Sequence, residues 1–142
     1  LDGVACSPVY ASEPVGFEGP EFYNLVVRAR TGESLAELVV RLRALEERLG
    51  RGRRAGDGAP ASRCIDLDLL LYGERVTEEP VALPRGDIHR YPFVARPLAD
   101  LAPQEREPAT GATFAELWAG FPAGSGATLR PVALELPCPG PQ

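Results

Sequence analysis

The sequence has 142 residues, of which 44% are hydrophobic and 25% charged, and this composition is typical of one globular domain with its own core. Its net charge of −5 argues against non-specific nucleic-acid binding, and no apolar run is long enough to predict a membrane span. The three cysteines are scattered, which predicts reduced thiols in a cytoplasmic protein.

The first third of the chain predicts extended segments followed by a long helix. Residues 4–15 form an extended segment interrupted by prolines, residues 16–20 a loop, and residues 22–31 a second strand. Ser34 and Glu37 then form a capping box, after which leucines and valines recur with helical spacing as far as Leu49. Gly50 is a typical C-cap. We therefore predict a helix over 35–49 whose apolar stripe faces the core.

Residues 63–73 predict a strand that carries two aspartates. Leu67 and Leu69 alternate with Asp66 and Asp68, and residues two apart on a strand point to the same side, about 7 Å from one another. Two carboxylates at this spacing suit Mg²⁺, which fills its other positions with water and phosphate oxygens. A solvated polar face is the alternative. A metal site is favoured because aspartate is a poor strand former and is costly in an apolar run.

The segment before this strand, residues 50–62, is rich in glycine and arginine. By itself such a segment is typical of a solvated linker. It leads, however, directly to the aspartates, and arginines beside a carboxylate pair match the two charge signs of a metal-bound polyphosphate. The sequence contains no Gly-x-x-x-x-Gly-Lys phosphate loop, which argues against a P-loop nucleotide site.

The second half predicts a short strand or hairpin arm over 74–83, a helix over 93–101 with Pro92 in its first turn, and a helix over 113–121. Residues 122–142 predict an irregular tail. The only histidine, His89, is more often structural than catalytic in such a setting. The order of elements predicts a single α+β domain over residues 1–142, with helices packed on a mainly antiparallel sheet.

Five segments together carry a resemblance: YASEPVG, FYN, LEERLGRGR, RCIDLDLLLYG and LPRGDIHRYPFVARPLADLAP. From about residue 4 to residue 103 the chain resembles the 6-hydroxymethyl-7,8-dihydropterin pyrophosphokinase family. The resemblance implies a ferredoxin-like α+β fold and a folate-biosynthesis enzyme that transfers the terminal diphosphate of ATP to the pterin and releases AMP. It also implies two Mg²⁺ ions, two small-molecule substrates and no nucleic-acid or membrane partner, and we expect a monomer.

The resemblance also assigns roles to individual residues. Asp66 and Asp68 match the metal-binding aspartates, and Arg51 and Arg53 match the arginines of a mobile catalytic loop. The residues implied to bind ATP are Arg43, Glu46, Arg63, Leu69, Arg85 and Tyr91. The residues implied to bind the pterin are Ser12, Val15, Phe22, Asn24 and Phe93, with the two phenylalanines on either side of the ring and Asn24 at its polar edge.

The chain departs from the family at several positions. The strand and helix with which the family opens, and their Gly-Ser-Asn motif, have no counterpart, so we expect this part of the fold to be missing. Because the sequence has no methionine, we also expect that Leu1 is not the start of translation. Arg85 and Tyr91 replace a histidine and an arginine, and Arg85, His89 or Arg90 could supply the lost charge. Two alternatives therefore stay open: a catalytically weakened binding module, or another Mg²⁺-dependent phosphoryl or nucleotidyl transferase.

Overall fold

The structure is a computed structural model that describes residues 2–12, 22–49 and 66–132. The chain forms two compact units, one made of Leu1–Gly32 and Gly86–Gln142, the other of Glu33–Arg85. The predicted combination of helices with antiparallel strands is confirmed. The single domain stays a prediction.

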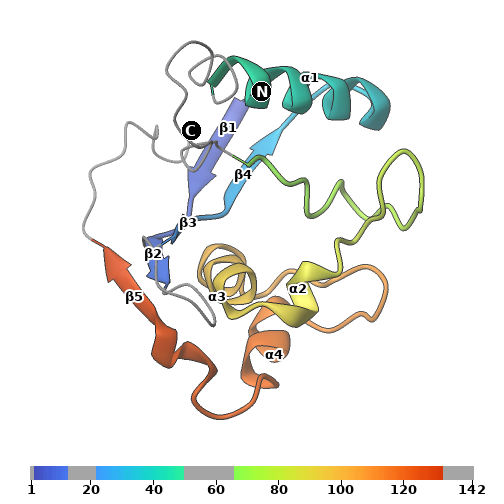
Figure 1. Cartoon of the computed structure of the whole chain (residues 1–142). Helices are drawn as coiled ribbons and strands as arrows, with labels where there is room; N and C mark the ends of the chain where they lie inside the picture. The colour runs from blue at the N-terminus through green and yellow to red at the C-terminus, as the bar shows by residue number, and fades with distance from the viewer. Residues whose placement is uncertain (1, 13–21, 50–65, 133–142) are drawn as a thin grey trace. The chain divides into compact units, whose positions relative to one another are not determined.

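The described strands of the first unit form two antiparallel sheets, drawn in Figure 1. One pairs β1 (Asp2–Cys6) with β4 (Val27–Arg30). In the other, β2 (Val9–Ser12) lies between β3 (Phe22–Asn24) and β5 (Leu129–Val132). All four residues of β2 are buried, because this strand is paired on both edges and also packs against the helix α3.

Two predicted strands are interrupted in the structure. The extended segment over 4–15 breaks at Ser7 and Pro8, and the strand over 22–31 breaks at Leu25 and Val26, so each contributes to both sheets. At the break the Ser7 N–H donates to the Val26 carbonyl at 2.8 Å, and the Val26 N–H donates to Ser7 Oγ at 2.8 Å. The ladder stops at Pro8 because proline has no N–H to donate.

The predicted irregular tail over 122–142 is wrong for part of its length. A 3₁₀ turn at Ser125–Thr128 leads into β5, in which Leu129 is buried and pairs with Ser12. The proline in this strand, Pro131, argued against a strand in the sequence. It is tolerated because β5 lies at the edge of the described sheet, where one row of N–H groups has no ladder partner to satisfy.

Three helices complete the first unit: α2 (Asp87–Arg90), α3 (Pro92–Leu101) and α4 (Phe114–Ala119). The predicted helix over 93–101 is confirmed as α3, with Pro92 at its first position. The predicted helix over 113–121 is confirmed as α4, which a Thr113–Glu116 capping box begins. Only α2 was not predicted. Ile88 of α2 and Phe114 of α4 are almost completely buried and belong to the core of this unit.

The second unit is organised around the helix α1 (Leu35–Leu49). The predicted capping box is confirmed: the Ser34 N–H donates to Glu37 Oε1 at 2.9 Å, and the Glu37 N–H donates to Ser34 Oγ at 3.2 Å. Leu35 and Val39 pack with Leu83 to form a small core. The apolar stripe faces the core only in its first half, since Leu49 is 47% exposed.

The predicted strand over 63–73 is not found in its described part, because residues 66–72 pair with no other described strand. A strand needs a neighbour for its backbone groups. Here the Leu70 carbonyl accepts from the Arg85 N–H at 3.0 Å, and the Leu67 N–H donates to a side chain of α1. Farther on, Thr77 and Leu83 exchange two backbone hydrogen bonds, which confirms a hairpin-like return within 74–83.

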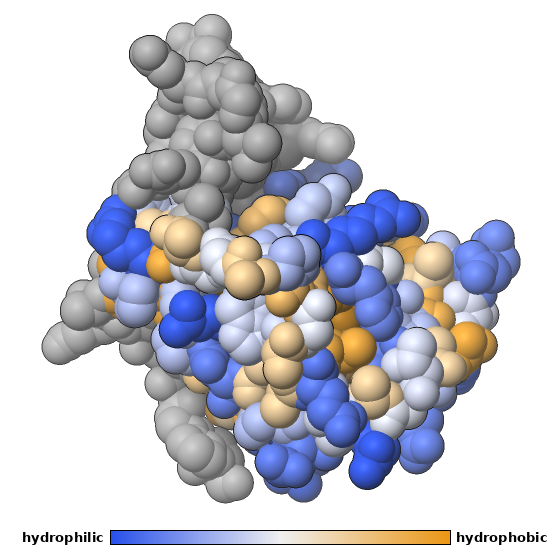
Figure 2. Space-filling view, turned by 90° about the horizontal axis from the view of Figure 1, so that it is seen from below, coloured by the Kyte–Doolittle hydropathy of each residue, from blue (hydrophilic) through white to orange (hydrophobic). Residues whose placement is uncertain are grey.

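Some large apolar side chains are exposed. Figure 2 shows hydrophilic and hydrophobic side chains intermixed on the face that it presents. The large exposed hydrophobic side chains of the described residues are Tyr23, Leu25, Val27, Val40, Leu49, Val76 and Tyr91. Exposed apolar side chains are normal on a globular protein, because more than half of its surface is apolar. Among the helices of the described segments, none has the length and the apolar character that crossing a bilayer requires.

Cys6, at the end of β1, is disulfide-bonded in the structure. The expectation of three reduced cysteines is therefore wrong for this residue, while Cys64 and Cys138 lie outside the described residues. The cytoplasmic location, which was inferred from reduced thiols, stays a prediction without that support.

Removing the cap of α1 is expected to destabilise the protein. Ser34→Ala leaves the Glu37 N–H without its acceptor, and we expect a loss of about 1 kcal/mol in the free energy of unfolding, measured by urea titration. Ser34→Asp, which keeps a capping oxygen, is the control and should stay within a few tenths of a kcal/mol of the parent. An equal loss in both variants would contradict the capping role.

Candidate functional site

The two aspartates lie on the solvent side of their segment. Asp66 and Asp68 are exposed, whereas Leu67 and Leu69 between and after them are half-buried. Leu69 packs against the small core of the second unit. The alternation expected of a strand is therefore present in the exposure of the side chains, although the segment pairs with no described strand. Both carboxylates are accessible to a cation from solvent.

A glutamate of α1 holds the peptide between the two aspartates. Glu46 Oε2 accepts a hydrogen bond of 2.6 Å from the N–H of Leu67. A charged acceptor makes this bond stronger than a bond between neutral groups. Helix α1 thus fixes the backbone from which both carboxylates project, a role that the resemblance did not indicate for Glu46.

One basic residue lies beside this pair. Arg85 Nη2 lies 3.7 Å from Asp68 Oδ1, and the two side chains are 39% and 49% exposed. An exposed pair at this distance contributes little to the stability of the fold. Of the three residues that could supply the missing charge, Arg85 is the one placed next to an aspartate of the pair.

The donor set fits Mg²⁺ shared with a phosphate chain. In the segments that the structure describes, no group of three or more histidine, cysteine, aspartate or glutamate side chains could hold a metal by itself. Mg²⁺ commonly takes one or two carboxylates and completes its octahedron with water and substrate oxygens. Two exposed carboxylates beside an arginine suit such a site, and they do not suit a closed structural zinc site.

The implied pterin-binding residues that are described lie in the first unit. In the β2–β3 ladder Ser12 is opposite Phe22, and Asn24 is opposite Tyr10. Phe22 and Asn24 are the first and last residues of β3. The antiparallel pairing therefore brings three of the predicted residues into one two-stranded ladder.

Phe93 stacks on another aromatic ring of the same unit. The centroids of the Tyr91 and Phe93 rings are 5.0 Å apart, with 17° between their planes. Tyr91 is the N-cap of α3 and is 40% exposed, while Phe93 is half-buried.

The remaining predicted residues are distributed as follows. Arg43 is exposed on α1, in the second unit together with Glu46, Asp66, Asp68, Leu69 and Arg85. Val15, Arg51, Arg53 and Arg63 lie outside the described residues.

Sequence reasoning missed a buried glutamate. Glu107 is completely buried, and His89 Nε2 lies 2.9 Å from Glu107 Oε2. Burial raises the pKa of Glu107. Hydrogen bonds from the Ala109 N–H, from His89 and from Thr110 together lower it by more than burial raises it, so the pKa lies below the ordinary value. This contact supports the structural role predicted for His89. No sequence signal indicates it, because the partners come from α2 and from the turn after α3.

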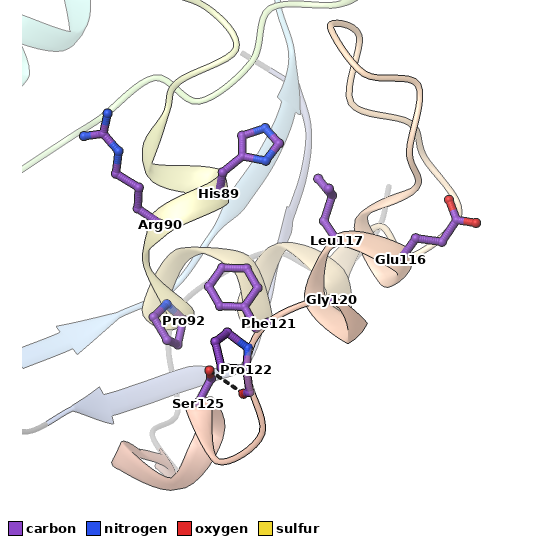
Figure 3. Close-up of a pocket in the computed structure, with 9 residues that line it drawn as sticks. All are labelled: His89, Arg90, Pro92, Glu116, Leu117, Gly120, Phe121, Pro122 and Ser125. Carbon is purple, nitrogen blue, oxygen red and sulfur yellow. Dashed lines mark hydrogen bonds between the residues drawn. The ribbon is translucent and has the colours of Figure 1, made fainter.

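A pocket of about 460 Å³ adjoins this pair in the first unit. Figure 3 shows that His89 and Arg90 of α2 lie on one side of it, and Leu117 of α4 and Phe121 on another. None of the residues predicted to bind ATP or the pterin lines this pocket.

Comparison with known proteins identifies related sequences. Residues 2–103 match the family model described as 7,8-dihydro-6-hydroxymethylpterin-pyrophosphokinase. A 2-amino-4-hydroxy-6-hydroxymethyldihydropteridine pyrophosphokinase of Pseudomonas aeruginosa is 39% identical over 121 residues, which cover 84% of this chain and 72% of that protein. A protein of the same name from Synechocystis sp. is 36% identical over 113 residues, covering 79% and 56%. The folic acid synthesis protein fol1 of Pneumocystis carinii is 33% identical over 111 residues, covering 77% and 15%.

Proposed function

The chain belongs to the 7,8-dihydro-6-hydroxymethylpterin-pyrophosphokinase family, and on that premise we propose that it transfers diphosphate from ATP to 6-hydroxymethyl-7,8-dihydropterin and releases AMP. The observation that carries this proposal is the exposed pair Asp66 and Asp68, with Glu46 bonded between them and Arg85 beside them. The matched part of the chain spans 56% of the length of the Synechocystis relative. The ferredoxin-like arrangement of the whole fold and the monomeric state belong to the same proposal.

In this proposal the two aspartates hold the metal. When bound, Mg²⁺ supplies charge neutralisation for the triphosphate and polarises the phosphorus that is attacked. Asp66 and Asp68 contribute oxygen ligands from an exposed segment whose backbone Glu46 holds in place. Arg85, whose Nη2 lies 3.7 Å from Asp68 Oδ1, would supply a guanidinium to the phosphate oxygens.

Other arginines act on the phosphate chain. Arg51, Arg53 and Arg63 would stabilise the charge that develops on the transferred and leaving phosphates, because a guanidinium donates two parallel hydrogen bonds to phosphate. Arg43 on α1 and the backbone of Leu69 would contact the nucleotide. Since all of the basic residues are arginines, the whole set stays charged at any working pH.

The pterin-binding residues recognise a flat, polar ring. Phe22 and Phe93 offer aromatic faces for offset stacking, and the Asn24 amide offers one donor and one acceptor to the ring edge. Ser12 and Val15 belong to the segment that would contact the ring through its backbone. The β2–β3 pairing, which places Ser12 opposite Phe22 in the same ladder as Asn24, supports this assignment.

The decisive experiment measures AMP formation from ATP by this chain, with Mg²⁺ and the reduced pterin present. AMP and the pterin diphosphate should appear in equal amounts, and neither should form without the pterin. If no AMP forms, titration calorimetry with the pterin separates the two alternatives. Binding without turnover would indicate a catalytically weakened module, whereas no binding would indicate a transferase with a different substrate.

The contact of Glu46 gives a separate prediction. Glu46→Leu removes the acceptor of the Leu67 N–H and frees the peptide between the aspartates, so we expect the Mg²⁺ concentration for half-maximal rate to rise about tenfold. Glu46→Gln keeps an acceptor oxygen and should raise it by less than about threefold. If instead both variants raised only the KM for ATP, Glu46 would be a nucleotide contact, as the resemblance implies.

A further inference from the structure

We infer that Tyr91 is a positioning residue for the pterin and not a nucleotide contact. The ring of Tyr91 holds the ring of Phe93 in the orientation in which Phe93 stacks on the pterin. This inference rests on the proposed function. Its basis is the geometry of the two rings, whose centroids are 5.0 Å apart with an interplanar angle of 17°. This is the range of an offset-stacked pair, which is attractive beyond the burial of its area.

The backbone of Tyr91 is fixed on both sides. Its N–H donates to the Asp87 carbonyl at 3.0 Å, at the end of α2. Its carbonyl accepts from the N–H of Val94 at 3.0 Å and of Ala95 at 2.9 Å, at the start of α3. The backbone of Tyr91 is thus held at the junction of two helices, and this fixes the point from which its ring stacks on Phe93.

The restriction of Phe93 matters for a stacked ligand. A side chain that is free in the unbound protein loses conformational entropy when a ligand immobilises it. Because the ring of Tyr91 already restricts the rotation of the Phe93 side chain, Phe93 loses this conformational entropy when the protein folds and not when the pterin binds. The ligand class that benefits is a flat heteroaromatic ring, which extends the stack of two rings to three.

The chemistry of the side chain argues against a phosphate contact. The resemblance places an arginine at this position, and a guanidinium neutralises phosphate charge. A phenol at neutral pH is uncharged and cannot do so. The arginine that the structure does place beside the aspartate pair is Arg85. Tyr91 therefore supplies a ring and not a charge.

The test compares Tyr91→Leu, which removes the ring, with Tyr91→Phe, which keeps it. Calorimetric titration of the full chain with 6-hydroxymethyl-7,8-dihydropterin should show the Kd rising about three- to tenfold in Tyr91→Leu and less than about twofold in Tyr91→Phe. The KM for ATP should change by less than about twofold in both. Tyr91→Met is a second ring-free variant, should Tyr91→Leu fold poorly. Phe121→Leu, which removes a ring from the Trp118–Phe121 pair of the same unit, is the matched control and should bind the pterin like the parent.

Each outcome decides the question. Unchanged pterin affinity in both ring-free variants would overturn the inference while the proposed function stands. A rise in the KM for ATP with an unchanged pterin Kd would assign Tyr91 to the nucleotide and overturn it as well. A parent chain that binds no pterin would overturn the proposed function, and the inference with it.

Discussion

Replacing Asp68 by asparagine is expected to lower the rate of AMP release by about 10³-fold or more while the fold is kept. Asparagine has nearly the same shape as aspartate but offers one neutral oxygen in place of a charged carboxylate. The side chain is 49% exposed, and among the described residues its carboxylate pairs with Arg85 at 3.7 Å, so its change should cost little stability. The measurements are the rate at saturating ATP and pterin and a thermal unfolding curve.

The matched control is Glu74→Gln, which neutralises an exposed carboxylate on the same unit, six residues farther along the chain. It should turn over like the parent. Turnover of Asp68→Asn within tenfold of the parent, about 1.4 kcal/mol, would show that Asp68 is not a metal ligand.

Helices and their caps could be predicted because their signals are local. The capping box at Ser34 and the proline at the start of α3 act within one turn, and both are found in the structure. The strands depended on partners that are distant in sequence. Hence residues 66–72, which looked most like a strand, have no described partner, while β5, which contains a proline, pairs with the buried β2.

The candidate site could be predicted in its residues but not in its contacts. The pattern of Asp66 and Asp68 indicated a cation site from the sequence alone, and their exposure agrees with it. That Glu46 bonds to the Leu67 N–H depends on how α1 packs against a segment about twenty residues away. The stack of Tyr91 on Phe93 likewise depends on the junction of α2 and α3, and α2 was not predicted.

Removing the buried carboxylate of Glu107 is expected to give the largest loss of stability. Its side chain is completely buried, and its oxygens accept from the Ala109 N–H, from the Thr110 N–H and hydroxyl, and from His89. Glu107→Ala leaves several of these donors without a partner, and we expect the free energy of unfolding to fall by about 3 kcal/mol. Chemical denaturation measures this loss.

Two variants separate the buried hydrogen bonds from the charge. Glu105→Ala removes a neighbouring glutamate that is 56% exposed and that pairs, among the described residues, with the exposed Arg28, so we expect a loss below about 1 kcal/mol. Glu107→Gln keeps the shape and one acceptor oxygen, and its amide can donate to the Thr110 hydroxyl. We expect it to lose about half as much as Glu107→Ala. Equal stability of Glu107→Ala and the parent would mean that the buried contacts do not form in solution.

The same carboxylate gives a pH dependence whose sign follows from its hydrogen bonds. Because the pKa of Glu107 is lower in the folded protein than in the unfolded chain, the unfolded chain binds more protons in the acidic range. The stabilisation is complete above the ordinary glutamate pKa of about 4.3 and is lost as the pH falls through the folded pKa. Hydrogen bonds from backbone N–H groups also lower the pKa values of Glu37 and Glu116, so these two residues likewise make the protein less stable in acid. The contribution of Glu107 alone is the difference in the free energy of unfolding between the parent and Glu107→Gln. That difference should shrink as the pH falls below about 4.3, and a difference that grew over this range would show that Glu107 is protonated in the folded protein.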